Sequence, residues 1–510
     1  MKIACMVVSS FLFSTLLQAQ DVGTNISLDL TTGKYRSIYN SDFSRFSDSR
    51  TAFAQSTPSD MVPTNMYGNL LNDNPAYNKR APFWRPVVAI IGTNVVTNLT
   101  DTYILQYDYS RVGIVSWRRN LKAGFPWDRS WIWAPDRFGM NFFMHPYGGG
   151  AFFNAARANG YTFWESAPFV LLGSYMWKIF GETGAPERNS LVATTFGGIF
   201  LGEIFYRLGS NILDDQTTGA NRFFREFAVA IISPTRFTSR LLNGYLTRVT
   251  PDEVYQKEPI NVTLSGGYHR VNEGTHFSGG GNNSVNLDMM VDYGNPFEKV
   301  SRKPFDYFKI RGDIDFGVGR KIVDAVTGDG ILYGSNVQAG SLEMLIGLFD
   351  HMNYFDNWTF ELGTFAFGPS VISKVPMSAK SSLYTNIHVG IVPFGALSNR
   401  FGPDTSQLRD YDFGGGAETK LETTYNFGGW VGVTFLGYYW LLHTYSGVAE
   451  NSYIGLIKPS IAFKIFDNIS LGYEHSVYYS DRYPTGLAAT HTVRTEEKIF
   501  LQMFLENLKF

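Results

Sequence analysis

The C-terminal half of the chain consists of short segments in which polar and apolar residues alternate. In residues 306–318 one parity is apolar, and the other carries the charged residues Lys309, Arg311, Asp313 and Asp315. Successive side chains of a β-strand point to opposite faces, so each such strand has one apolar and one polar face. A soluble sandwich buries the apolar face against a second sheet. A barrel in lipid turns that face outward and keeps the charges in its lumen.

The same alternation recurs along the rest of this half. It is clear in residues 260–268, 285–293, 420–427 and 469–479, and turn-rich pieces lie at 279–283, 324–330, 399–416 and 480–490. Closed bacterial barrels have even strand numbers. We therefore predict an antiparallel transmembrane β-barrel of about 12 strands over residues 255–510. A strand contributed by residues 103–115 is an alternative for one of the twelve.

Composition supports a sheet with one face in lipid. Aromatic residues make up 16% of the chain and charged residues only 17%, with 51 glycines. Soluble domains carry roughly 25% charged residues. The net charge of −2 gives no support for nucleic-acid binding.

Both ends of the chain carry features typical of exported outer-membrane proteins. Met1 and Lys2 precede an apolar stretch that ends at Leu17, which predicts a signal peptide over residues 1–19 cleaved near Ala19. An N-terminal anchor helix is the alternative. Residues 20–80 are polar and predict a loosely ordered arm. The sequence ends at Phe510 in a strand-like segment, which resembles the C-terminal signature that the barrel-assembly machinery reads.

The middle of the chain has a different pattern. Residues 81–250 contain helix-like apolar segments at 165–181, 190–213 and 221–249, with Ser190 as a candidate N-cap. Gly198 and Gly202 form a small-xxx-small pair, which lets two helices approach closely. We predict a compact helical insert that packs against the periplasmic end of the barrel or inside its lumen.

This region also holds the candidate catalytic residues. One hypothesis is a lipid-directed enzyme in which His145 is the general base and Glu165 or Glu203 orients it, with Arg207 nearby. The alternative is structural, since Glu203 and Arg207 have the i, i+4 spacing of a helical ion pair. No G-x-S-x-G or H-E-x-x-H motif occurs. No two histidines have metal-ligand spacing, so neither a metal nor a cofactor is predicted, and His269 and His276 are expected to be exposed at a hairpin.

Several short motifs carry a resemblance to a known family. They are N-F-x-x-H-P-Y at 141–147, A-R-x-x-G at 156–160, E-S at 165–166 and G-E-x-x-Y-R at 202–207. Together they resemble an uncharacterised family of bacterial envelope proteins, known only as a domain of unknown function, over about residues 100–210. The resemblance implies an envelope setting and no known activity.

The leading functional prediction is an integral outer-membrane barrel with a role in transport or envelope maintenance. An outer-membrane enzyme acting on lipid or lipopolysaccharide is the second hypothesis, and a structural or docking protein is the third. The expected partners are outer-membrane lipid and the barrel-assembly machinery. Substrate and oligomeric state are left open.

Overall fold

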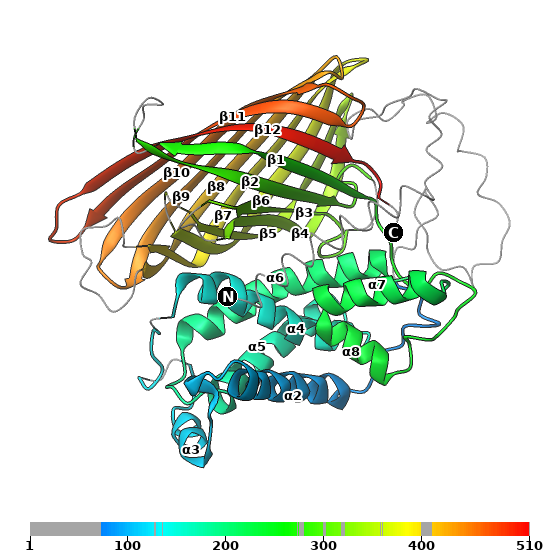
Figure 1. The fold of residues 1–510 in the computed structure, drawn as a ribbon, viewed down its shortest axis with the longest axis vertical. Helices are drawn as coiled ribbons and strands as arrows, with labels where there is room; N and C mark the ends of the chain where they lie inside the picture. Colours follow the sequence, from blue (N-terminus) through cyan, green and yellow to red (C-terminus); the bar gives the residue numbers. More distant parts are fainter. Residues whose placement is uncertain are drawn as a thin grey trace.

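The computed structural model describes residues 73–126, 129–134, 136–272, 274, 280–298, 302–317, 322–357, 359, 361–398 and 411–508. The predicted signal peptide, most of the predicted N-terminal arm and Phe510 lie outside these residues. The described part contains a helical region followed by a β-barrel (Figure 1).

The helical region precedes every strand. Its main helices are α2 (Trp84–Leu99), α3 (Ile114–Lys122), α4 (His145–Arg157), α5 (Phe163–Phe180), α6 (Arg188–Ile212), α7 (Gly219–Ile232) and α8 (Pro234–Leu242). Short π-helical turns at Thr100–Ile104 and Met140–Met144 adjoin α2 and α4, and a 3₁₀ turn lies at Asp108–Ser110. Of the described helices, only α6 is long and apolar enough to cross a membrane, and most of it is buried in the protein.

The barrel is formed entirely by residues 260–505. Its strands are β1 (Ile260–Asn272), β2 (Gly281–Tyr293), β3 (Phe308–Asp315), β4 (Val323–Ala339), β5 (Leu342–Asp356), β6 (Glu361–Ser378), β7 (Ser381–Ser398), β8 (Tyr411–Phe427), β9 (Val431–Ser446), β10 (Glu450–Lys464), β11 (Ile469–Pro484) and β12 (Thr490–Leu505). Each strand pairs antiparallel with its neighbours in sequence, and β1 pairs with β12 to close the barrel. The predicted 12-stranded antiparallel barrel is confirmed.

The prediction that residues 103–115 lend a strand is wrong. Asn98 and Thr102 both donate hydrogen bonds to the backbone carbonyl of Ser110, at 2.8 and 3.1 Å. These bonds fold the segment back onto the end of α2. Local side-chain hydrogen bonds of this kind compete with strand pairing, and here they prevent it.

Contacts between strands that are not neighbours identify the inner face of the barrel. Lys309 of β3 lies 3.1 Å from Glu422 of β8, and Asn353 of β5 donates a hydrogen bond to Glu418 of β8 at 2.8 Å. Such contacts form only across the concave side of a closed sheet. Residues of the opposite parity therefore face outward. Many are large, apolar and exposed, including Val285, Ile346, Ile387, Phe435, Tyr439, Leu471 and Leu501.

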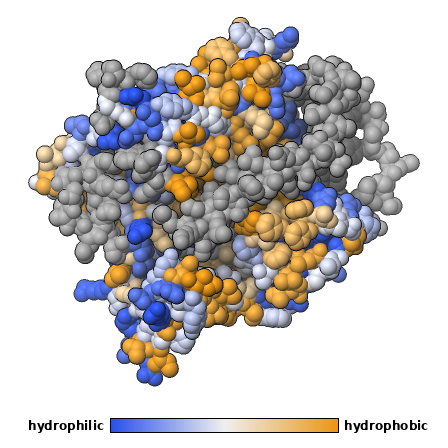
Figure 2. All heavy atoms as spheres, in the orientation of Figure 1, coloured by the Kyte–Doolittle hydropathy of each residue, from blue (hydrophilic) through white to orange (hydrophobic). Residues whose placement is uncertain are grey.

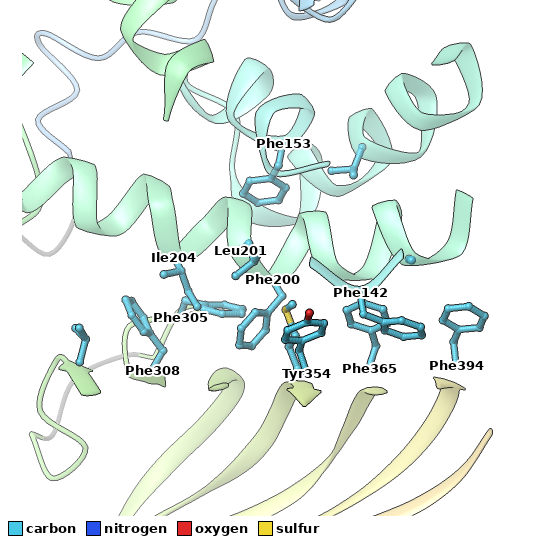
Figure 3. Packing of buried hydrophobic residues seen from close by; sticks show 14 of the residues in the cluster. Phe142, Phe153, Phe200, Leu201, Ile204, Phe305, Phe308, Tyr354, Phe365 and Phe394 are labelled. Atoms are coloured by element: carbon cyan, nitrogen blue, oxygen red, sulfur yellow. The ribbon is translucent and has the colours of Figure 1, made fainter. Parts of the chain in front are cut away.

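The helical region packs against part of this outer wall. The largest core cluster joins α6 residues such as Phe200 and Leu201 to outward-facing residues of seven strands. The strand residues are Ile260 and Val262 (β1), Val291 and Tyr293 (β2), Phe308 (β3), Met352 and Tyr354 (β5), Phe365 (β6), Phe394 and Ala396 (β7), and Tyr411 and Phe413 (β8). Figure 3 shows α6 lying across the strands, with aromatic side chains from both sides between them.

Strand pairing explains why one straight helix meets so many strands. Val262 pairs with Val291, which pairs with Ile310, and Met352 pairs with Phe365, which pairs with Phe394. These residues form a row perpendicular to the strands, and α6 follows the row. The helical region thus packs on outward-facing residues of the wall, so the lumenal position that the sequence offered as one alternative is wrong.

Two helices of this region pack closely against each other. A Cβ atom added at Gly198 of α6 would lie 2.5 Å from the backbone of Gly149 of α4. One at Gly202 would lie 2.6 Å from Phe153. The Gly198–Gly202 pair therefore brings α4 and α6 into backbone contact, as such spacing predicts.

Candidate functional site

The barrel interior is lined by charged side chains, several of which bond between strands that are not neighbours. Lys420 lies 2.7 Å from Asp329, and His269 lies 2.6 Å from both Asp315 and Glu496. Lys498 pairs with Asp288, and Arg482 pairs with Glu450. His269 is almost fully buried, so its expected exposure at a hairpin is wrong. The two carboxylates on either side of its ring hold it inside.

The charged residues predicted to face the lumen lie in this network. Lys309 contacts Glu422, and Arg311 lies 3.8 Å from the same carboxylate. Asp313 accepts a hydrogen bond from Asn286, and Asp315 pairs with His269. All four side chains have partners on other strands.

Two apolar layers lie inside the barrel, on either side of Asp329 along β4. One layer includes Phe355 of β5 and Trp440 of β9, whose ring centroids are 5.6 Å apart across the lumen. The other includes Tyr307, next to β3, whose hydroxyl lies 3.3 Å from that of Tyr384 on β7. Side chains from non-neighbouring strands therefore meet across the interior at both layers.

Between the layers lies a cluster that combines histidines and carboxylates. Asp329 of β4, His351 of β5 and His388 of β7 offer ligand atoms that all lie within 4.8 Å of one another. Both histidines are buried, and Nε2 of His351 has no hydrogen-bond partner. Imidazole and carboxylate together suit late transition-metal ions.

Glu418 of β8 supports this cluster. Its Oε2 atom accepts hydrogen bonds from Asn353, Thr364 and Trp440 at 2.8, 3.2 and 3.0 Å. Its Oε1 atom lies 2.8 Å from Nδ1 of His351, without hydrogen-bond geometry. The fixed carboxylate therefore faces one ring nitrogen and leaves the other facing Asp329.

The catalytic candidates in the helical region do not assemble as the enzyme hypothesis requires. Glu165 forms a capping box with Thr162 at the start of α5 and pairs with Arg80 at the surface. Glu203 is fully buried between Arg157 and Arg207, at 2.7 and 2.8 Å. Neither carboxylate forms a described bond with His145. Glu203 and Arg207 make the i, i+4 ion pair of the structural alternative.

Arg207 also connects the helical region to the barrel. Its Nη1 atom lies 2.8 Å from Asp306, just before β3, and its Nη2 atom donates to the carbonyl of Pro304 at 2.7 Å. The Glu203–Arg207 pair therefore helps to anchor α6 to the chain that enters the barrel.

His145 has partners that the sequence did not suggest. Its Nε2 atom lies 2.8 Å from Oγ of Ser190 and 3.7 Å from a carboxylate oxygen of Asp136. A hydrolase triad needs the carboxylate at the other ring nitrogen, Nδ1. Ser190 is also fully buried and lies inside α6, which begins at Arg188, so it is not the predicted N-cap. This arrangement lacks the geometry of a triad.

The charge environment of His145 is nevertheless well defined. Burial alone would raise the pKa of Asp136, but the hydrogen bond and charge of His145 bring that pKa below its ordinary value. Glu187, which precedes α6, has its pKa raised to about 7 by burial, although Lys178 opposes this shift. The negative charges of Glu182 and Asp136 add to the increase.

Sequence spacing could not have revealed the histidine cluster. His351 and His388 lie on strands separated by β6, and they meet because β6 presents the small residue Ala366 opposite His351. Gly390 on β7 helps too, since a Cβ there would lie 3.3 Å from Nδ1 of His351. The expectation of no metal site rested on the spacing of histidines along the sequence. That spacing does not detect residues that strand pairing brings together.

Comparison with known proteins supports the resemblance seen in the sequence. Residues 130–235 match the family model of a domain of unknown function (DUF3943). The match runs from just before Trp131 into α8 and includes the motifs at 141–207. No curated protein matches this chain.

Solved structures similar to this chain are outer-membrane barrels. The outer membrane channel DcaP of Acinetobacter baumannii is 8% identical, with 48% of this chain and 96% of that chain covered and a TM-score of 0.23. The toluene transporter TodX of Pseudomonas putida is 7% identical, with 51% and 90% covered and a TM-score of 0.22. Likeness this distant carries no functional argument, and the barrel rests on its own strand pairing.

Proposed function

We propose that this protein is an integral outer-membrane barrel that provides a gated transport pathway, closed at rest. The observation that carries the proposal is the division of its wall, with charged residues bonded across the interior and large apolar residues exposed outside. Transmembrane barrels have this distribution. Figure 2 shows apolar side chains gathered on the visible barrel wall and on the helices beneath it. In this proposal the wall contacts outer-membrane lipid, and the barrel-assembly machinery inserts the protein there.

The side-chain contacts across the interior support a gated pathway over an open porin. The Phe355–Trp440 and Tyr307–Tyr384 contacts both span the lumen, so a solute passes only when these side chains move. Interior ion pairs between the layers would make the pathway suitable for a small polar solute.

Membrane insertion is tested by fractionation and heat-modifiable gel mobility. We expect the protein in a purified outer-membrane fraction, with unboiled protein running faster than boiled protein. Soluble protein with no mobility shift would contradict the proposal.

Gating is tested by conductance in planar lipid bilayers. We expect wild-type protein to conduct little, and a variant with Phe355→Ala, Trp440→Ala and Tyr384→Ala to conduct ions. Tyr439→Ala is the matched control because Tyr439 adjoins Trp440 on β9 but faces outward. If the triple variant has normal heat-modifiable mobility yet remains silent, the lumen is not a pathway. The protein would then have a role in envelope maintenance and not in transport.

A further inference from the structure

We propose that the barrel interior binds a divalent transition-metal ion, with Asp329, His351 and His388 as its ligands. The three residues come from different strands and present their ligand atoms within 4.8 Å of one another. The site is independent of transport, since a barrel that conducts nothing can still bind a metal and a conducting one can lack the site.

The chemistry of the ligands selects the class of ion. Two imidazoles and one carboxylate favour zinc and its neighbours in the first transition row over calcium or magnesium, which prefer oxygen ligands. Around tetrahedral zinc, ligand atoms lie about 3.3 Å apart, given bonds of about 2.0 Å. The ligand atoms of the present cluster, within 4.8 Å of one another, are thus at most about 1.5 Å farther apart than in such a site.

The surroundings of His351 match those of a metal ligand. Its Nε2 atom lies 4.0 Å from Asp329 and its Nδ1 atom lies 2.8 Å from Glu418. Metal-binding histidines commonly present one ring nitrogen to the ion and the other to a carboxylate that orients the ring. Glu418 is a positioning residue of this kind because three hydrogen bonds fix its other oxygen.

Burial adds a second, independent indication. Nε2 of His351 and Nδ1 of His388 are buried without hydrogen-bond partners. Leaving polar atoms unsatisfied in this way is costly, and an ion bound by one nitrogen of each ring would satisfy them. Along β5 the cluster lies between Phe349 of one apolar layer and Phe355 of the other, so water is poorly placed to replace the ion.

Lys420 supplies the competing cation. Its Nζ atom lies 2.7 Å from Asp329 and 3.9 Å from Glu418. A divalent ion that binds Asp329 must therefore displace the ammonium group, and removal of that group should tighten metal binding.

Binding is tested with the full-length protein in detergent, first treated with a chelator and then titrated with zinc chloride against a chromophoric competitor. We expect one zinc ion per chain. His351→Gln and His388→Gln should each weaken binding at least tenfold, and Lys420→Met should strengthen it. His491→Gln is the control, because that histidine is 61% exposed and lies away from the cluster.

Cobalt provides a readout that a merely structural role would not affect. Cobalt(II) in place of zinc should give the visible absorption bands of a tetrahedral site in wild type, and these bands should be lost in His388→Gln. Heat-modifiable mobility checks that each variant is folded. A folded wild type that binds no zinc, or a folded His351→Gln, His388→Gln double variant with wild-type affinity, would overturn the proposal.

Discussion

At the scale of single residues, the buried charged side chains of the helical region form ion pairs with one another. Glu203 accepts hydrogen bonds from Arg157 and Arg207. Arg207 also donates a hydrogen bond to Asp306, which lies just before β3. A buried carboxylate is tolerated when its oxygens are bonded and its charge is balanced. Removing one partner leaves the others unpaired inside the protein.

Glu203→Gln should therefore destabilise the helical region by about 3–5 kcal/mol. The change removes the charge that Arg157 and Arg207 share. Urea unfolding followed by circular dichroism at 222 nm measures the loss. Glu165→Gln is the control, since its surface ion pair with Arg80 contributes about 0–1 kcal/mol. Equal effects of the two changes would contradict the assignment.

A pH effect is expected at Glu187. Its pKa in the folded protein is about 7, above the ordinary value, so folding favours its protonated form. This contribution to stability is full below the unfolded pKa of about 4.3 and is lost as the pH rises through 7.

Glu187→Gln mimics the protonated form and should remove this dependence. We expect the melting temperature of the variant, relative to wild type, to rise between pH 5 and 7 and then level off. In Glu165→Gln the difference should stay flat over this window, because hydrogen bonds from Thr162 lower the pKa of Glu165. A flat difference for Glu187→Gln as well would disprove the assigned pKa.

Single residues were also where sequence reasoning reached least far. The i, i+4 spacing predicted the Glu203–Arg207 pair because both partners lie on one helix. The contact between His145 and Ser190, and the approach of His351 to His388, join residues of different elements. Such contacts depend on helix packing and strand order, which local patterns do not determine.

At the scale of elements, the contact between α4 and α6 is the tightest in the helical region. Gly198→Ala should destabilise it by about 1–3 kcal/mol, because the new methyl group would meet the backbone of Gly149. Gly148→Ala is a matched control on α4, since nothing lies near its added Cβ. Thermal melts followed at 222 nm compare the two, and a Gly198→Ala melt equal to that of wild type would argue against this close packing.

Strands were predictable for a reason that does not apply to the helical region. A strand with lipid on one side and charges on the other shows strict alternation, so β3 and β11 are visible in the sequence alone. The segment at 103–115 alternates only in part, and bonds from Asn98 and Thr102 to Ser110 determine its fold. The placement of α6 was missed because outward-facing residues such as Phe365 and Phe394 are apolar whether they meet lipid or a helix.

At the scale of the whole molecule, the helical region contributes no strand to the closed barrel. Every strand pair, including β1 with β12, lies within residues 260–505. A chain that lacks residues 81–250 but keeps the first 80 should therefore still form a closed barrel. We expect it to show heat-modifiable mobility with a lower temperature of conversion, since the contacts of Arg207 and α6 are lost. If this variant does not form a closed barrel, the helices are needed for the strands to assemble.

In the proposed membrane-spanning barrel, α6 would give the molecule two unlike sides in the plane of the membrane. Where the helices lie against the wall, they would displace the ring of lipids that otherwise surrounds a barrel. A neighbouring protein would then reach the strands that no helix covers from the opposite side. Packing in a crowded membrane would then be directional, and each copy would meet its neighbours in a limited set of orientations.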